Sequence, residues 1–339
     1  ILFLCFFLFL LIESRLPQDI YVDYTGAFSS DKDLRLDQPV TFFFQLDPLV
    51  SITSWISGHT LIKGFLWGVG ILVLAVLLGR IFCGFICPFG TIHHATGRFR
   101  AALKGDRMVQ ANRKTPSQKI KYFNLVVLLA ASVIGLNLAG LLDPIAFLYR
   151  SLALSILPAV GVGLRAIFDM MAASDFKPFN LLSYGAEVLV SPIFGYSDEV
   201  FQSAWFIGIL FVVILFLNRL KPRFWCRILC PLGALLGLFS RFSILRLEKY
   251  EEKCTRCNLC LKHCQGAASP RTDQAWETAE CLMCFNCHNV CPEDALAFRF
   301  SWTPKLTRKP DIGKRAVLGG LCAGLSLPLL GRLDGQIHM

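Results

Sequence analysis

The stretch that decides the fold reads Cys254-Thr-Arg-Cys257-Asn-Leu-Cys260-Leu-Lys-His-Cys264 and, sixteen residues later, Cys281-Leu-Met-Cys284-Phe-Asn-Cys287-His-Asn-Val-Cys291-Pro292. Both runs have the spacing with which bacterial ferredoxins bind two [4Fe–4S] clusters. In that arrangement three cysteines of one run hold one cluster, and the fourth ligates the other cluster. The spacing predicts a first cluster set of Cys254, Cys257, Cys260 and Cys291, and a second cluster set of Cys281, Cys284, Cys287 and Cys264.

Two other uses of cysteine fit this stretch less well. A zinc site typically takes two Cys-x-x-Cys pairs, which leaves the third and fourth thiols of each run unexplained. A disulfide framework belongs to small secreted domains in oxidising compartments. Gln265 stands where the motif has proline, as it does at Pro292 in the other run. Because proline is no ligand, the expected ligand sets are unchanged.

The composition is that of a membrane protein. Of 339 residues, 54% are hydrophobic and only 17% are charged, which is too apolar for an ordinary soluble domain. The net charge of +10 suits nucleic acid or a membrane surface. No nucleic-acid motif appears and the basic residues flank apolar runs, so we expect membrane lipid and no nucleic acid as a partner. The chain opens inside an apolar run, which favours a helix lacking its first half over a signal-like stretch.

Four apolar segments are candidate membrane spans: Ile1–Ile12, Leu61–Ile86, Tyr122–Leu142 and Val200–Leu220. The loops between them alternate in charge. Residues 13–60 hold 3 basic against 7 acidic side chains, residues 89–121 hold 8 against 1, and residues 143–201 hold 3 against 6. By the positive-inside rule, residues 89–121 and everything after residue 218 are cytoplasmic. The ferredoxin-like stretch is then expected on the cytoplasmic side of a bacterial inner membrane, and both acidic loops in the periplasm.

One apolar stretch is not counted among the spans. Ile145–Met171 is interrupted by Arg150, Pro158 and Arg165 and by two glycines. An extra crossing there would upset the alternation of charge. We therefore expect an interfacial or re-entrant helix.

The membrane part contains an internal repeat. Leu46-Asp47-Pro48 precedes the second span, which ends in Cys83-x-x-x-Cys87-Pro-x-Gly; Leu142-Asp143-Pro144 and Cys226-x-x-x-Cys230-Pro-x-Gly bracket the fourth span in the same order. Two units that run in the same direction imply a pseudo-two-fold axis along the membrane normal.

That axis should bring four cysteines to one depth. We call Cys83, Cys87, Cys226 and Cys230 the cysteine–proline centre. The i, i+4 spacing places each pair on one helix face, and the following proline ends or bends the helix. Four thiols together could bind a third cluster or act as redox-active thiols. Alternatively, small cysteine side chains only allow close helix packing.

His59 and Asp47 are the candidates for a proton acceptor. A quinol-oxidising site needs such a group near the membrane interface, but a helix-entry histidine and a turn-forming aspartate are the more common roles. Asp143 shares this balance. A site near His59 would be separated from the clusters by a bilayer core of ~30 Å, so a quinone site nearer the cytoplasm or an intermediate centre would be required. The adjacent His93 and His94 are read as a solvated loop in preference to a haem ligand pair.

The expected fold is an α-helical membrane domain of about four spans with a parallel internal repeat, joined to a small α+β ferredoxin domain. The boundaries are residues 1–240 for the membrane domain, 241–304 for the ferredoxin domain, and 305–339 for a basic linker with an apolar segment. Lys314-Arg315 before that apolar segment fits either a twin-arginine-like export signal or a further anchor helix.

The Leu-Asp-Pro, Ser-Gly-His, Cys-x-x-x-Cys-Pro and paired ferredoxin motifs occur here in an order that resembles the polyferredoxin-like membrane quinol dehydrogenases of the NapH type. Proteins of the NosR and FixG/CcoG types share the Cys-x-x-x-Cys-Pro and ferredoxin parts. The resemblance spans roughly residues 40–300 and includes Ser57-Gly58-His59. It implies four spans, cytoplasmic clusters, and electron transfer from the quinol pool towards a periplasmic reductase.

Three classes of function compete. The first is an electron-transfer subunit that oxidises quinol and passes electrons to another redox protein, periplasmic or membrane-associated. The second is a maturation or regulatory protein that uses the same electrons for metal reduction or assembly. The third, a structural anchor, is disfavoured by eight cluster cysteines. The motifs do not separate the first two.

Overall fold

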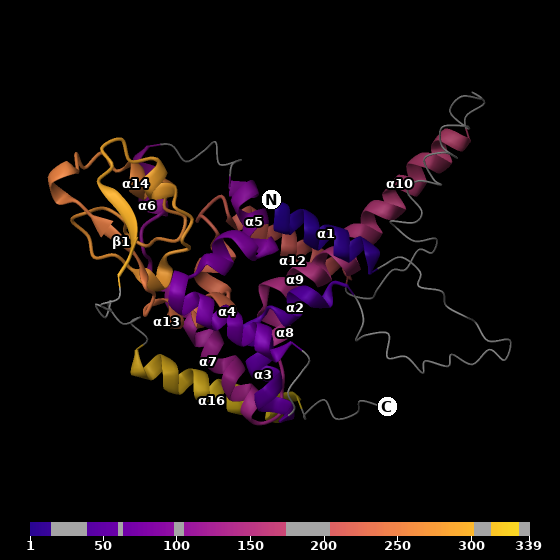
Figure 1. The fold of residues 1–339 in the computed structure, drawn as a ribbon. Coiled ribbons are helices and arrows are strands. Elements are labelled where there is room, and N and C mark those ends of the chain that lie inside the picture. The colour runs from indigo at the N-terminus through magenta and orange to yellow at the C-terminus, as the bar shows by residue number, and fades with distance from the viewer. Residues whose placement is uncertain (15–38, 60–63, 98–104, 174–203, 302–312, 332–339) are drawn as a thin grey trace.

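The computed structural model describes residues 1–14, 39–59, 64–97, 105–173, 204–301 and 313–331. The described part is mostly helical, with a bundle that carries the ferredoxin domain at one end (Figure 1). The first half of the chain forms α1 (Leu2–Glu13), α2 (Thr41–Gln45), α3 (Pro48–Gly58), α4 (Phe65–Leu78), α5 (Pro88–Gly97), α6 (Asp106–Ala111), α7 (Ile120–Val133), α8 (Ala139–Leu142), α9 (Pro144–Arg150) and α10 (Leu157–Ala172). The second half forms α12 (Ala204–Leu217), α13 (Pro231–Ser240), α14 (Leu259–His263), α15 (Asn286–Asn289) and α16 (Lys314–Gly331).

The core of the bundle is aromatic at the point where the two repeat units meet. The rings of Phe147 and Trp225 stack with centroids 4.8 Å apart. Phe89 packs against both of them and against Phe211. Because α5, α9, α12 and the turn after α12 each contribute one ring, this cluster holds the two units together.

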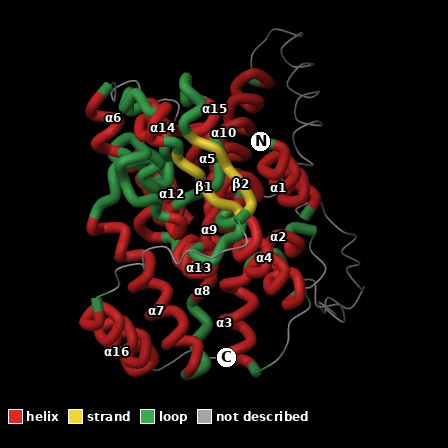
Figure 2. Tube along the Cα trace, turned by 60° about the vertical axis from the view of Figure 1, so that its left-hand side comes forward, coloured by secondary structure: helices red, strands yellow, loops and turns green. Residues whose placement is uncertain are grey.

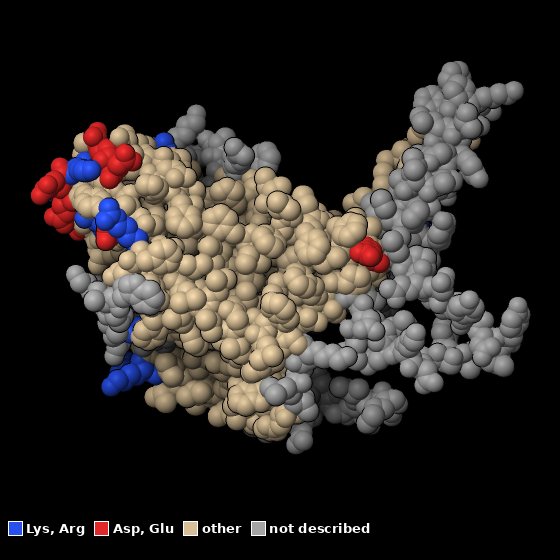
Figure 3. All heavy atoms as spheres, in the orientation of Figure 1, with Lys and Arg blue, Asp and Glu red and all other residues tan. Residues whose placement is uncertain are grey.

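The outer face of the bundle is apolar. Large hydrophobic side chains on α1, α4, α12 and α16 are exposed, among them Leu66, Trp205 and Leu318. In Figure 3 the charged side chains gather mainly at the end with β1 and α14, while uncharged side chains cover the body. A soluble protein rarely exposes such a continuous apolar surface, whereas lipid would cover it without cost.

Most apolar helices are shorter than the predicted spans. The helix α4, for example, has 14 residues and therefore rises about 21 Å at 1.5 Å per residue, less than a ~30 Å bilayer core. Within the described residues, Pro144–Ala172 is the single helix that is long and apolar enough to cross a membrane. The prediction of four spans therefore remains a proposal. Of the two acidic loops, residues 15–38, residue 60 and residues 174–201 lie outside the described residues.

The stretch expected to be interfacial is in fact this longest helix. The helix α9 continues through a π-turn at Ser151–Ile156 into α10 without a break. Pro158 falls at the start of α10, next to the π-turn, where a missing N–H donor costs little. The interruptions seen in the sequence are thus absorbed inside a 29-residue helix.

The C-terminal helix α16 packs along α7 (Figures 1 and 2). Its contact face carries Gly320 and Gly324 four residues apart, both buried. A Cβ atom at Gly324 would lie 2.5 Å from the Val127 carbonyl oxygen and 2.6 Å from the Ala130 Cβ. This is the small-xxx-small packing of membrane helices, and it favours the anchor-helix interpretation of residues 314–331 over an export signal.

The ferredoxin domain has a two-stranded antiparallel sheet. The strand β1 (Leu245–Lys249) pairs with β2 (Leu296–Phe300), with Leu247 opposite Phe298. The sheet brackets all eight ferredoxin cysteines in the sequence, and α14 and α15 lie between the strands along the chain. This is the small α+β unit that the cysteine spacing predicts.

We expect Gly324→Val to destabilise the protein by about 1–3 kcal/mol, because the added side chain overpacks the α7–α16 interface. Gly319→Val, in the same helix, is the matched control, since nothing lies within 4 Å of its Cβ position. Thermal unfolding in detergent measures the difference. Equal shifts for the two variants would mean that the helices do not pack as described.

Candidate iron–sulfur and cysteine–proline sites

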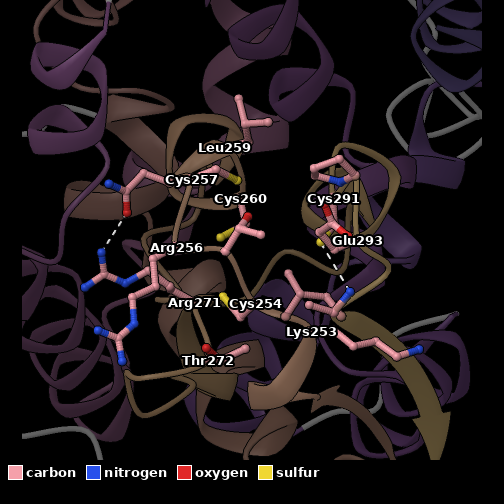
Figure 4. Close-up of a pocket in the computed structure, with 15 residues that line it drawn as sticks. Lys253, Cys254, Arg256, Cys257, Leu259, Cys260, Arg271, Thr272, Cys291 and Glu293 are labelled. Carbon is pink, nitrogen blue, oxygen red and sulfur yellow. Dashed lines mark hydrogen bonds between the residues drawn. The ribbon is translucent and has the colours of Figure 1, made fainter.

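The structure groups the eight ferredoxin cysteines around two cavities. One cavity, with an empty volume of about 370 Å³, is lined by the first cluster set (Figure 4). The other, of about 330 Å³, is lined by the second cluster set. No three His, Cys, Asp or Glu side chains in the described residues are close enough to hold a single ion. Thiols spread around a cavity instead suit a cubane, whose iron atoms occupy separate corners.

The loops around the two cavities have the same backbone form. In each run, the residues on both sides of the second cysteine have positive φ. These residues are Arg256 and Asn258 around Cys257, and Met283 and Phe285 around Cys284. Side chains other than glycine rarely adopt this conformation, so the chain is bent here to wrap a cavity. The fourth cysteines also match, because Ala268 N–H donates to Cys264 Sγ and Ala295 N–H to Cys291 Sγ, each at 3.3 Å.

The two cavities differ in exposure. Cys257 of the first cluster set is exposed, whereas Cys281 of the second cluster set is buried. Burial raises the pKa of the Cys260 thiol to about 11 and that of Cys281 to about 12. Iron binds thiolates, so loading these sites releases protons that the buried thiols otherwise keep. The first cavity therefore faces solvent, and the second faces the bundle.

Lys249 of β1 fixes the segment between the two cysteine runs. Its ammonium group donates to the carbonyl oxygens of Ser269, Arg271 and Gln274 at 3.1, 2.8 and 2.7 Å. Burial lowers the pKa of Lys249 to about 8, against the opposing influence of nearby cysteines. This lysine was not anticipated from the sequence, where it is one basic residue of a polar strand.

The cysteine–proline centre lies inside the bundle, with all four thiols buried. Each Cys-x-x-x-Cys sits on a π-helical turn, Phe82–Ile86 in one unit and Trp225–Leu229 in the other. The turns close with bonds from Cys87 N to Phe82 O at 2.9 Å and from Cys230 N to Trp225 O at 3.0 Å. The expected α-helical face is therefore a π-turn, a feature that often marks functional sites.

The four thiols are close enough for all of them to interact electrostatically across the two units. Cys87 and Cys230 each begin a helix, α5 and α13, with the proline in its first turn. The Gly233 N–H donates to the Cys230 sulfur at 3.1 Å, and Gly90 N–H plays the same part for Cys87. A helix N-terminus stabilises negative charge, so these N–H groups would stabilise a cluster held by Cys87 and Cys230.

The second cavity rests directly on the bundle. Its neighbour Glu280 is buried and accepts from Lys121 Nζ at 2.5 Å and from Tyr122 Oη at 3.3 Å. A Cβ atom at Gly84, between the first two cysteines of the cysteine–proline centre, would lie 2.4 Å from the Leu282 carbonyl oxygen. The backbone beside Cys281 therefore touches the turn beside Cys83.

Asp47 and Asp143 come together, whereas Asp47 and His59 do not. Asp47 caps α3 by accepting from Leu49 N at 2.7 Å, and Asp143 caps α9 by accepting from Ala146 N at 2.8 Å. The two buried carboxyl groups are within hydrogen-bonding reach of each other, and Asp143 interacts electrostatically with Cys87. His59 ends α3 in the left-handed conformation and is exposed, a helix of 11 residues away from Asp47. The two candidate proton acceptors therefore lie at opposite ends of α3.

The prediction that His93 and His94 lie in a solvated loop is wrong. Both belong to α5. His93 is fully buried and meets the edge of Phe89 at 4.5 Å between ring centroids. His94 is exposed, and its Nδ1 lies 2.8 Å from Gln265 Nε2.

Comparison with known proteins matches the duplicated part of the chain to a family. A family described as "4Fe-4S binding domain" matches residues 60–105 and again residues 203–248. The two matches cover the two repeat units with their Cys-x-x-x-Cys-Pro motifs, upstream of Cys254. No solved structure matches the chain.

The similar proteins are spread over archaea and bacteria. An uncharacterized protein of Methanocaldococcus jannaschii is 28% identical over 75% of this chain and 78% of its own length. The ferredoxin-type protein NapH of Haemophilus influenzae is 25% identical over 74% of each chain. The regulatory protein NosR of Pseudomonas aeruginosa is 25% identical over 72% of this chain, which is 26% of the relative. Together with the two cavities and the duplicated cysteine–proline turns, these matches show that the chain is similar to polyferredoxin-like proteins of the NapH and NosR type.

Proposed function

We propose that this iron–sulfur electron-transfer protein is embedded in the bacterial inner membrane, oxidises quinol and passes the electrons to another redox protein. The observation that carries the proposal is the direct seating of the second cavity on the cysteine–proline centre, through Leu282 and Gly84. A protein that only anchors a ferredoxin has no need to press its cluster loops against buried cysteines. When bound, a [4Fe–4S] cluster supplies one-electron storage.

The exposure of the two cavities supports a direction of electron transfer, from the buried second cavity to the exposed first cavity. The exposed Cys257 marks the first cavity as the place where a redox partner can approach. The buried second cavity faces the membrane part. Because electron exchange requires close approach of the redox centres, the partner is proposed to dock at the solvent-facing end of the ferredoxin domain.

The cysteine–proline centre is proposed to be redox-active, as a third cluster site or as redox thiols. Three features support this proposal: four buried thiols within interaction range, two helix N-termini aimed at Cys87 and Cys230, and the family match described as 4Fe-4S binding over both units. A centre here lies inside the bundle, on the side where the ferredoxin domain docks. It would therefore shorten the distance between a quinol site and the ferredoxin cysteines.

The carboxyl pair Asp47–Asp143 is proposed as the proton acceptor for quinol. Two carboxyl groups in contact cannot both stay ionised, so they hold and release a proton as a pair. Their position near Cys87 supports a quinone site on the ferredoxin side of the bundle. The exposed His59, at the other end of α3, is too far away to share this role.

A second candidate function is redox-dependent regulation or maturation. This candidate is supported by the similarity of the chain to a protein named regulatory protein NosR. The same cavities and the same cysteine–proline centre would serve both functions, which differ in the acceptor of the electrons.

We expect anaerobically purified protein to contain about eight iron and about eight acid-labile sulfide per chain from the ferredoxin cysteines, and about twelve of each if the cysteine–proline centre also binds a cluster. Cys257→Ser should lower the iron content by about four. Cys322→Ser, at an exposed thiol of α16, is the control and should change nothing. Zinc in place of iron would overturn the assignment.

Changing Cys83, Cys87, Cys226 and Cys230 together to Ser should stop quinol from reducing the ferredoxin clusters, because the centre between them and the quinol is removed. The clusters themselves should stay assembled, as iron analysis checks. The measurement is bleaching of cluster absorbance after anaerobic mixing with menaquinol or ubiquinol. Unchanged bleaching would leave only a packing role for the four cysteines. A wild-type protein that neither quinol reduces would refute quinol oxidation.

The ferredoxin domain is proposed to be cytoplasmic and the acidic loops periplasmic, because basic residues concentrate in residues 89–121 and beyond residue 218. An impermeant maleimide added to intact cells should label Ser30→Cys and spare Gln110→Cys, an exposed position of α6. After the cells are opened, both should react. The opposite pattern in intact cells would reverse the topology.

A further inference from the structure

Besides its cysteines, each repeat unit contains an arginine at the same position. In each unit an arginine stands three residues before the first cysteine, as Arg80-Ile-Phe-Cys83 and Arg223-Phe-Trp-Cys226. The side chains are 1% and 3% exposed. A buried guanidinium requires fixed acceptors, so what these two arginines bind is informative.

Arg80 links the first unit to the segment before Cys281. Its Nη1 donates to the Ala279 carbonyl oxygen at 2.8 Å, and its Nη2 lies 4.0 Å from the Cys83 sulfur. The same Nη2 lies 2.7 Å from the position of a Cβ at Gly233. Arg80 thus starts in one unit, crosses to the cysteine–proline turn of the other, and holds the chain two residues before a member of the second cluster set.

Arg223 does the equivalent from the second unit. Its Nη1 donates to the Cys83 carbonyl oxygen at 2.9 Å, and its Nε donates to Gln265 Oε1 at 2.8 Å. Gln265 directly follows Cys264, another member of the second cluster set. The backbone of Arg223 has φ 48°, a left-handed conformation that is strained for arginine, so the contacts hold this residue in an unfavourable form.

We propose that Arg80 and Arg223 are a repeat-related pair of positioning residues that connect both ends of the second cluster set to the cysteine–proline centre. Their charge raises the reduction potential of the cluster that the second cluster set holds. The inference rests on the proposed iron–sulfur function. It gives Gln265 a role as well, because the residue that replaces the usual proline supplies the side-chain oxygen that Arg223 binds.

The local charge balance supports an effect on potential. Glu280 pairs with Lys121 and also lies 4.0 Å from Arg80 Nη1, so this one carboxylate offsets only one of the two cations. Positive charge is therefore in surplus beside the buried cysteines. A third arginine, Arg227, is also buried and interacts with Cys264. One-electron reduction of a cluster adds negative charge, and fixed cations in a buried site stabilise the reduced form.

A purely structural role predicts something different. If the arginines only hold the loops, their replacement should loosen the fold or change cluster loading without a selective change in potential. If their charge acts on the cluster, Arg223→Lys should keep the potential that Arg223→Gln loses. The charge-neutralising Gln265→Glu should lower the potential while the arginine stays in place.

The test is an anaerobic redox titration of the full-length protein with dithionite, followed by EPR, with the two ferredoxin signals assigned in Cys257→Ser and Cys284→Ser variants. In Arg223→Gln we expect the reduction equilibrium of the second cluster to fall at least about tenfold, or about 59 mV for a one-electron couple. The first cluster should shift far less. Arg219→Gln removes the same charge from an exposed position and should leave both potentials unchanged.

The proposal is overturned if Arg223→Gln leaves the second potential at the wild-type value, or shifts both clusters equally. Should Arg223→Gln fail to load iron, Gln265→Glu decides the matter, and an unchanged second potential there also overturns it. The titration needs no quinol. A protein that does not oxidise quinol would therefore fail the proposed function and still give an answer here.

Discussion

The structure depends on the burial of one short segment, Thr278–Met283, between the two repeat units. Glu280 is held by Lys121 and Tyr122 from α7. Ala279 is held by Arg80, and the Leu282 backbone lies against Gly84. A carboxylate buried this deeply is tolerated only with such partners, and removal of one partner of a buried pair typically costs about 3–5 kcal/mol. This segment connects the ferredoxin domain to the bundle, and it ends in the second cluster set.

The duplication explains how the bundle can offer such a seat. Both units build the same π-turn and begin a helix at the second cysteine. In each unit an arginine contacts the other unit. They differ where the ferredoxin domain docks, because Gly84 of the first unit corresponds to Arg227 of the second. A side chain at Gly84 would displace the Leu282 carbonyl, whereas Arg227 donates to the carbonyl oxygens of Ala111 and Arg113. The ferredoxin domain therefore docks at Gly84 of the first unit, and the equivalent position of the second unit, Arg227, has other partners.

Sequence reasoning reached the parts that depend on fixed spacing. The ferredoxin cysteines surround two cavities in the crossed sets that the motif implies, and the four thiols of the Cys-x-x-x-Cys-Pro turns come within interaction range. It failed where a residue acts through a distant partner. Arg80 and Arg223 did not stand out in the sequence, since their acceptors lie 199 and 42 residues away in the chain. The signal was present, because both arginines occupy the same place in the repeat. Helix lengths were also misjudged, since hydrophobicity alone marks neither the π-turn in Ser151–Ile156 nor the early end of α4 at Leu78.

The second ferredoxin cluster is proposed to lie directly against the cysteine–proline centre. Cryo-electron microscopy of the anaerobically purified protein in lipid nanodiscs tests it most directly. We expect iron–sulfur density bounded by Cys264, Cys281, Cys284 and Cys287, with the Arg80 and Arg223 side chains between it and the sulfurs of Cys83 and Cys226. Density for a ferredoxin domain that stands away from the bundle, or for single metal ions in place of clusters, would contradict the account.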